Sequence, residues 1–275
     1  APPRPAPPPK VLAASTTMGL VYVAAVKEVV RRRRLVFLGL AVAFPLLLTV
    51  IWRFYGTEDL TPTRFFANVG GLIYLKALVY LVSLFFGIPT VYDEIEGRTL
   101  TYLTTRPLSR WSVYAGRLLA VQTVAGLLLA GSLGLCFFFM VAGNLQALSL
   151  EFVKIYTNYF LVVLLAVFCY SAVFALMGTA LKKPLVWGIL YIFAWESTVS
   201  AAPIRLQMYT FEWHLRNLVV SREDVQKSLL DFVGALLRVE FSLPAWGSLL
   251  ILVVATTGLM LLGGWIFGRK EYLLS

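Results

Sequence analysis

Long apolar stretches alternate with short charged stretches along this chain of 275 residues. A helix needs about 20 mostly apolar residues to cross the hydrocarbon core of a bilayer, and there it satisfies its own backbone hydrogen bonds. The pattern predicts six such spans, near residues 35–52, 66–92, 118–143, 155–181, 185–204 and 245–268. We therefore expect an all-α membrane protein in which residues 18–275 form a single transmembrane domain.

The N-terminal region shows two further patterns. Residues 1–17 open with a proline-rich run, which can form neither a helix nor a packed core, so we expect a disordered tail there. In residues 18–34 the valines recur at helical spacing and four consecutive arginines follow. This pattern predicts an amphipathic helix on the cytoplasmic face of the membrane, where its cations favour anionic lipid headgroups.

The connection between the fifth and sixth spans, residues 204–243, also carries helical patterns. Apolar positions recur at helical spacing from Leu206 to Asn217, and a second apolar face follows from Val225 to Leu237 behind a capping signal at Ser221. We expect two short amphipathic helices on the extracytoplasmic side.

Composition strengthens this interpretation. Only 14% of the residues are charged, whereas a soluble domain carries about a quarter. The net charge of +10 comes from cations that flank the apolar runs and form no basic face, so we expect no nucleic-acid partner. With six spans and a cytoplasmic N-terminus, the inner segments carry more Lys and Arg than the outer ones, which indicates that both termini are cytoplasmic.

Two ionisable residues lie clearly inside predicted spans, Lys76 and Glu196. Charges inside a membrane are costly and are functional candidates by default. Both lie toward the outer half of their spans, where Lys76 can extend its amine toward the interface. Two interpretations stay open: contact with a substrate along a transport path, or a structural pair between the two. His214 is the only histidine, so the sequence supports no metal site.

The polar block from Asp93 to Arg117 is the most informative stretch. Its acids come first and its cations later, an order that complements the dipole of a helix from about Glu94 to Thr104. Pro107 then ends that helix, and Ser109 can cap the third span. The block predicts a short cytoplasmic helix between spans two and three, on which a partner protein could push.

The residues of this block resemble the permease (transmembrane) subunits of the type-2 ABC transporter family, which are six-span ABC exporters. The resemblance is carried by Glu94, Glu96, Gly97, Thr99, Leu100, Leu103, Arg106, Pro107, Ser109, Arg110, Gly116 and Arg117. Members of the family most often have the sequence Glu-Gly-Thr-Leu here, whereas Arg98 separates Gly97 from Thr99 in this chain. The residues Lys27 and Glu28 ahead of the arginine cluster resemble the family's N-terminal elbow helix.

The resemblance implies a permease that exports a substrate across the cytoplasmic (inner) membrane of a bacterium and works as a homodimer with two ABC ATPase subunits. A partner on the periplasmic or extracellular side stays open. The helix between spans two and three would be the coupling helix, which docks in a groove of the ATPase. Its coupling residues would be Glu94, Glu96, Gly97, Thr99, Leu100, Leu103, Arg106, Pro107 and Arg110.

The chain is not expected to be an enzyme by itself. It has no G-x-x-x-x-G-K-[ST] run to cradle phosphates, so ATP and Mg²⁺ would be used by the partner ATPase, and we expect no cofactor on this chain. Two alternatives stay open. One is an ABC-type membrane anchor that performs mechanical or signalling work on a partner complex, and the other is a secondary transporter.

Overall fold

The computed structural model describes residues 14–31, 34–55, 61–96, 110–142, 148–201, 205–219 and 243–269. Every regular element in these ranges is a helix, which confirms the predicted all-α class. Five helices in this part of the chain are long and apolar enough to cross a membrane: Leu38–Tyr55, Pro62–Tyr92, Arg110–Val141, Leu150–Ala180 and Ala245–Arg269. The predicted span at 185–204 is not among them.

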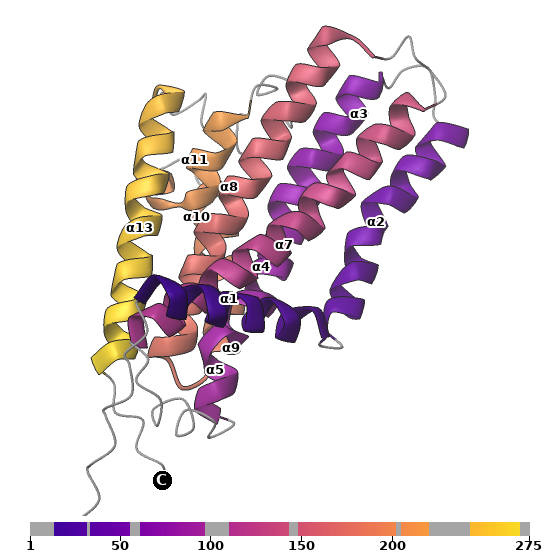
Figure 1. Ribbon diagram of the computed structural model, residues 1–275. Helices are drawn as coiled ribbons and strands as arrows, with labels where there is room; N and C mark the ends of the chain where they lie inside the picture. The colour runs from indigo at the N-terminus through magenta and orange to yellow at the C-terminus, as the bar shows by residue number, and fades with distance from the viewer. Residues whose placement is uncertain are drawn as a thin grey trace, which may run out of the picture.

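Helix α1, Ala14–Arg31, lies across the bundle instead of along it (Figure 1). It begins at Ala14, so it includes residues 14–17 that the sequence assigned to the tail. Val23 and Val30 are about half exposed, so the predicted apolar stripe faces away from the bundle. The opposite face packs on α7, where a Cβ on Gly116 would lie 3.0 Å from the Met18 carbonyl oxygen. We call the end of the bundle where α1 lies the α1 end.

The first two long helices run in opposite directions. Helix α2, Arg34–Tyr55, leaves the α1 end and contains Pro45. The second long helix, which we call the second rod, returns to the α1 end. It consists of α3 (Pro62–Asn68), the π-helical η1 (Val69–Leu78) and α4 (Val79–Gly87). The same rod continues as α5, Pro89–Glu96, at the α1 end, and only Ile88 separates α4 from α5; we call this residue, whose backbone stays α-helical, the α4–α5 turn.

Three long helices complete the bundle. Helix α7, Arg110–Val141, rises from the α1 end, and α8, Leu150–Ala180, returns to it. Ser149 starts α8 by accepting a hydrogen bond from the Phe152 N–H at 3.1 Å. Helix α13, Ala245–Arg269, finishes the described chain at the α1 end. The apolar core lies mainly between α4, α7 and α8.

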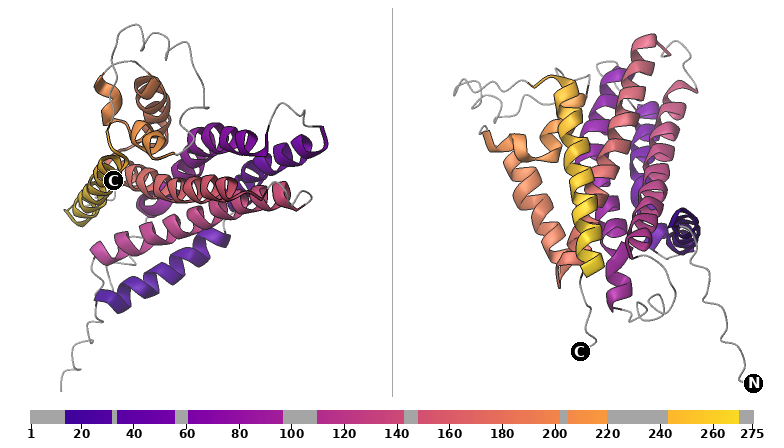
Figure 2. Two further views of the ribbon diagram at one scale, coloured as in Figure 1. Left: turned by 90° about the horizontal axis from the view of Figure 1, so that it is seen from above. Right: turned by 60° about the vertical axis from the view of Figure 1, so that its left-hand side comes forward.

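The stretch between α8 and α13 is helical but interrupted. It comprises α9 (Pro184–Leu190), the π-helical η3 (Tyr191–Ser197) and α10 (Thr198–Ala201), which together lead away from the α1 end (Figure 2). A 3₁₀ turn, η4 (Arg205–Tyr209), and α11 (Phe211–Leu218) follow.

The sequence predicted one helix from Leu206 to Asn217, but the structure divides it at Thr210. The Thr210 hydroxyl accepts a hydrogen bond from the Trp213 N–H at 3.3 Å and so caps a new helix. The second helix predicted in this connection, near 221–237, lies outside the described residues.

Candidate functional site

The first candidate site is the predicted coupling segment, which begins in α5. This helix extends the second rod at the α1 end (Figure 1) and carries Glu94 and Glu96 in its last turn. The other residues of the predicted coupling set lie outside the described ranges, except Arg110. Arg110 is the first residue of α7, and its Nη1 donates to the Gly268 carbonyl at 3.3 Å, which ties the start of α7 to the end of α13.

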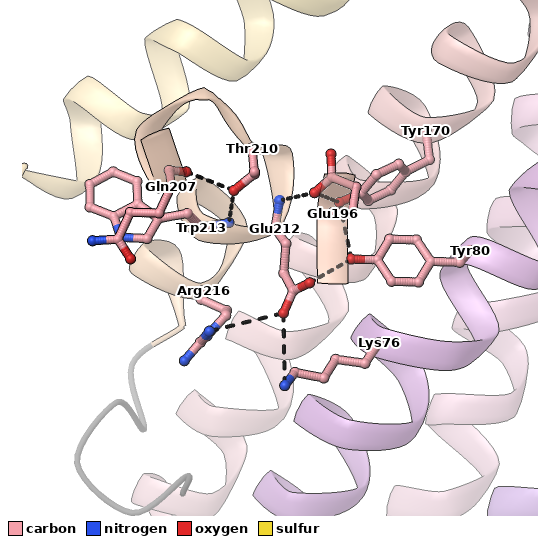
Figure 3. Close-up of polar contacts among 9 residues, drawn as sticks. All are labelled: Lys76, Tyr80, Tyr170, Glu196, Gln207, Thr210, Glu212, Trp213 and Arg216. Atoms are coloured by element: carbon pink, nitrogen blue, oxygen red, sulfur yellow. Dashed lines mark hydrogen bonds and ion pairs between the residues drawn. The ribbon is translucent and has the colours of Figure 1, made fainter. Parts of the chain in front are cut away.

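The second candidate site is a polar network between η1, η3 and α11 (Figure 3). Lys76 from η1 and Arg216 from α11 both approach Glu212, with N–O distances of 3.8 Å and 4.0 Å to Oε1. The Tyr80 hydroxyl donates to the other carboxylate oxygen at 2.9 Å. Glu212 is nearly buried, whereas the side chains of Lys76 and Arg216 are 41% and 45% exposed. One buried carboxylate thus holds two cations that keep an open side.

Glu196 forms the inner half of this network. Its carboxylate is fully buried and accepts hydrogen bonds from the hydroxyls of Tyr170 and Tyr191. It also accepts from the backbone N–H groups of Phe211 at 3.3 Å and Glu212 at 3.0 Å. These two N–H groups open α11, so the carboxylate lies where the helix dipole favours a negative charge.

The sequence left open a pair between Lys76 and Glu196. In the structure both belong to one network, but Glu212 lies between them (Figure 3): Lys76 pairs with Glu212, and Glu196 binds hydroxyl and backbone donors. Sequence reasoning missed Glu212, Tyr80 and Tyr170. The sequence did contain a signal for Glu212, because this acid shares one face of an expected amphipathic helix with apolar residues. Tyrosines inside the spans gave no distinct signal.

Both ionisable residues found from the sequence lie in π-helical stretches. Lys76 is in η1 and Glu196 is in η3. A π-helical turn contains an extra residue, which changes the direction of the side chains around it, and such turns are frequent at functional sites. The backbone here therefore departs from the α-helix at the two places where charged side chains enter the bundle.

Polar contacts also fix α11 to α13. His214 Nε2 donates to the Met208 carbonyl at 2.8 Å, and its Nδ1 lies 3.3 Å from the Ser248 hydroxyl. Asn217 Nδ2 lies 2.9 Å from the same hydroxyl and donates to the Leu243 carbonyl at 2.8 Å. Burial lowers the pKa of His214, because the imidazolium loses its hydration. The neutral ring suits these contacts.

A bundle of long apolar helices with a charged network between them defines a multi-pass membrane protein. Comparison with protein families identifies which kind. Residues 29–194, more than half of the chain, match the family described as ABC-2 family transporter protein, and the chain belongs to this family. It is therefore a transmembrane permease component of an ABC transporter, a family whose members associate with ABC ATPase subunits and are not themselves catalytic. No curated protein matches the chain.

Proposed function

We propose that this chain couples ATP hydrolysis by separate ABC ATPase subunits to export of a substrate across the cytoplasmic membrane of a bacterium. One observation carries the proposal: the second rod continues past its turn at Ile88 into α5, at the α1 end of the bundle. A force applied to α5 would thus reach the buried core directly. ATP and Mg²⁺ would be used by the ATPase.

The coupling helix would begin with α5 and use the residues that the sequence indicated. Of these, Glu94 and Glu96 lie in the last turn of α5 and Arg110 begins α7, at the two ends of the segment. Between them the set includes Gly97, Thr99, Leu100, Leu103, Arg106 and Pro107. Its acids and its apolar positions would contact the groove of the ATPase.

The run from Pro184 to Ala201 is proposed as the sixth crossing. Both α8 and α13 end at the α1 end (Figure 1), so the chain must travel to the opposite end between them. The run leads in that direction (Figure 2). The α1 end carries Arg31, Arg110, Lys182, Lys183 and Arg269, which favours the cytoplasm for this end and so for both termini.

The working unit is proposed to be a dimer of two copies of this permease with two ATPase subunits. α1 would serve as the elbow helix, with its exposed valines in the inner leaflet. A periplasmic or extracellular partner would meet the opposite end of the bundle.

The polar network is proposed to border the substrate path. Lys76 and Arg216 are each almost half exposed beside the nearly buried Glu212 (Figure 3). A charge facing lipid tails costs several kcal/mol, so these side chains need water or a polar molecule beside them. This observation favours transport over a purely mechanical anchor, which needs no polar lining.

The test uses the complex of this permease with the ATPase that co-purifies with it, reconstituted in lipid nanodiscs. We expect Glu94→Ala, Glu96→Ala and Leu100→Ala each to reduce permease-dependent ATP hydrolysis several-fold, because they lie in the proposed contact. Glu151→Ala is the control, since Glu151 is exposed on α8 at the opposite end of the bundle. Hydrolysis at the wild-type rate in all three variants would overturn the coupling role.

The path is tested in the same complex by reversing charge at Lys76 and Glu196. We expect Lys76→Glu to reduce permease-dependent hydrolysis, because it places two carboxylates together beside the path. Glu196→Lys should instead prevent assembly of the bundle, since it would present a cation to four hydrogen-bond donors. Unchanged hydrolysis with both reversals would exclude a role for the network in transport.

A further inference from the structure

The geometry points to Arg117 as a positioning residue: we propose that it ties α5, the start of the coupling segment, to α1, so that movement of α5 is passed to α1. The inference rests on the proposed function, because it assumes that an ATPase moves α5. It adds a residue outside the predicted coupling set and a route by which that movement would spread.

Arg117 joins three segments that are far apart in the sequence. It lies near the start of α7, and its side chain is only 15% exposed. Its Nη1 donates to the Thr90 carbonyl in the first turn of α5 at 3.2 Å. Its Nη2 donates to the Glu28 carboxylate of α1 at 3.4 Å. A guanidinium can make both bonds at once because its donors form a rigid fork.

The surroundings of Arg117 strengthen its hydrogen bonds to Thr90 and Glu28. Arg117, Glu28 and Thr90 line one pocket together with apolar side chains from α1, α4, α5 and α7, among them Ala25, Val29, Phe85 and Pro89. Hydrogen bonds made by a charged group are stronger than those between neutral groups, and only 15% of the Arg117 side chain is exposed. A displacement of α5 must therefore either break the bond at Thr90 or move α7 and α1 with it.

The turn before α5 is held on another side by α8. A Cβ on Gly178 would lie 2.6 Å from the Ile88 carbonyl oxygen, so the two backbones are in close contact. The Thr90 hydroxyl also donates to the Phe86 carbonyl at 3.0 Å, which fastens the first turn of α5 to the end of α4. The α4–α5 turn is thus a packed joint, and Arg117 is its charged connection to α1.

The competing interpretation is that Arg117 has a purely structural role. In that case Arg117 only holds α1 against α7, and its loss would reduce stability without changing how α5 responds to the ATPase. The two interpretations differ in two measurable properties: amide hydrogen exchange in residues 89–96, and permease-dependent ATP hydrolysis measured well below the unfolding temperature.

The experiment compares Arg117→Gln, Arg117→Lys and Glu28→Gln in the permease–ATPase complex in nanodiscs. We expect Arg117→Gln to lower permease-dependent hydrolysis several-fold and to speed exchange in residues 89–96. Arg117→Lys should recover part of both, because an ammonium can reach one acceptor. Glu28→Gln should lower hydrolysis less and leave exchange in α5 unchanged, because the Thr90 bond stays.

The matched control is Arg31→Gln, which removes the same group from an exposed position on α1 and should change neither property. Because Glu28 and Arg117 share one contact, the double variant should match Arg117→Gln alone. Wild-type hydrolysis and exchange in a folded Arg117→Gln complex would overturn the inference. A wild-type complex with no permease-dependent hydrolysis would instead overturn the proposed function, and the inference with it.

Discussion

At the scale of single residues, the buried carboxyl group of Glu196 shows how hydrogen-bond donors alone, among the described residues, can hold an acidic side chain inside a membrane protein. Its two oxygens receive two hydroxyls and two backbone N–H groups. All four donors suit a carboxylate, and the two N–H groups belong to the first turn of α11. The residue therefore helps to fix α11 against the bundle, together with the contacts of His214 and Asn217 to α13 and its N-terminal side.

Glu196→Gln should destabilise the protein by about 1–3 kcal/mol, because an amide NH₂ group cannot accept and would leave buried donors unpaired. The measurement is the thermal unfolding midpoint of the purified permease in detergent. Glu151→Gln, which changes an exposed glutamate, should leave the midpoint nearly unchanged. A loss of the same size in both variants would contradict the role assigned to Glu196.

Glu212 and Lys76 should respond unequally to loss of their ion pair. Glu212 is nearly buried while Lys76 is 41% exposed, so solvent screens the amine but not the carboxylate. Lys76→Met should then cost less than about 1 kcal/mol. Glu212→Gln should cost about 1–3 kcal/mol, because the buried Tyr80 hydroxyl loses its charged acceptor and both cations lose their anion at once. The unfolding midpoints of the two variants check this order, and equal losses would contradict it.

At the scale of elements, the long helices could be predicted because apolarity is a local property of the sequence. Their ends were less predictable. The third span was expected from residue 118, but α7 begins at Arg110, because polar residues can continue a helix beyond the hydrocarbon region. The break at Thr210 and the π-helical stretches were not predicted, since they depend on contacts with distant residues. Lys76 and Glu196 could be found from sequence because charges inside apolar runs are rare, whereas the weaker signal for Glu212, an acid in a polar connection, was missed.

Gly178→Ala tests how closely α8 must approach the α4–α5 turn. The new Cβ would meet the Ile88 carbonyl at 2.6 Å, and a backbone oxygen cannot rotate away as a side chain can. Overpacking of this kind costs about 1–3 kcal/mol. We expect a lower unfolding midpoint and, since α5 follows this turn, faster amide exchange in residues 89–96.

Gly258→Ala is the matched control for this contact. It makes the same change in α13, where the added Cβ would meet no atom within 4 Å. Alanine is the better helix former by up to about 1 kcal/mol, so this variant should be as stable as the wild type or slightly more stable. If both alanines had the same effect, the close packing of α8 on Ile88 would not be needed.

At the scale of the whole molecule, the family match and the polar network overlap only in part. The match ends at residue 194, in η3, so Lys76, Tyr80 and Tyr170 lie inside it. Glu196, Glu212 and Arg216 lie beyond it. The network thus joins the matched bundle to α11, and α11 is joined in turn to α13. Whether Pro184–Ala201 crosses the membrane decides on which side α13 begins.

Cysteine labelling tests that crossing. Cys136 and Cys169 are buried, so they should not react with a maleimide. The labelling of each newly introduced cysteine can therefore be measured separately. If the run crosses, Leu148→Cys and Pro244→Cys should react with a membrane-impermeant maleimide in intact spheroplasts, and Lys183→Cys only after permeabilisation. Leu148 and Lys183 flank α8 and fix the orientation. Labelling of Lys183→Cys and Pro244→Cys under the same condition would mean that the run does not cross, and that the described end of α13 lies opposite α1.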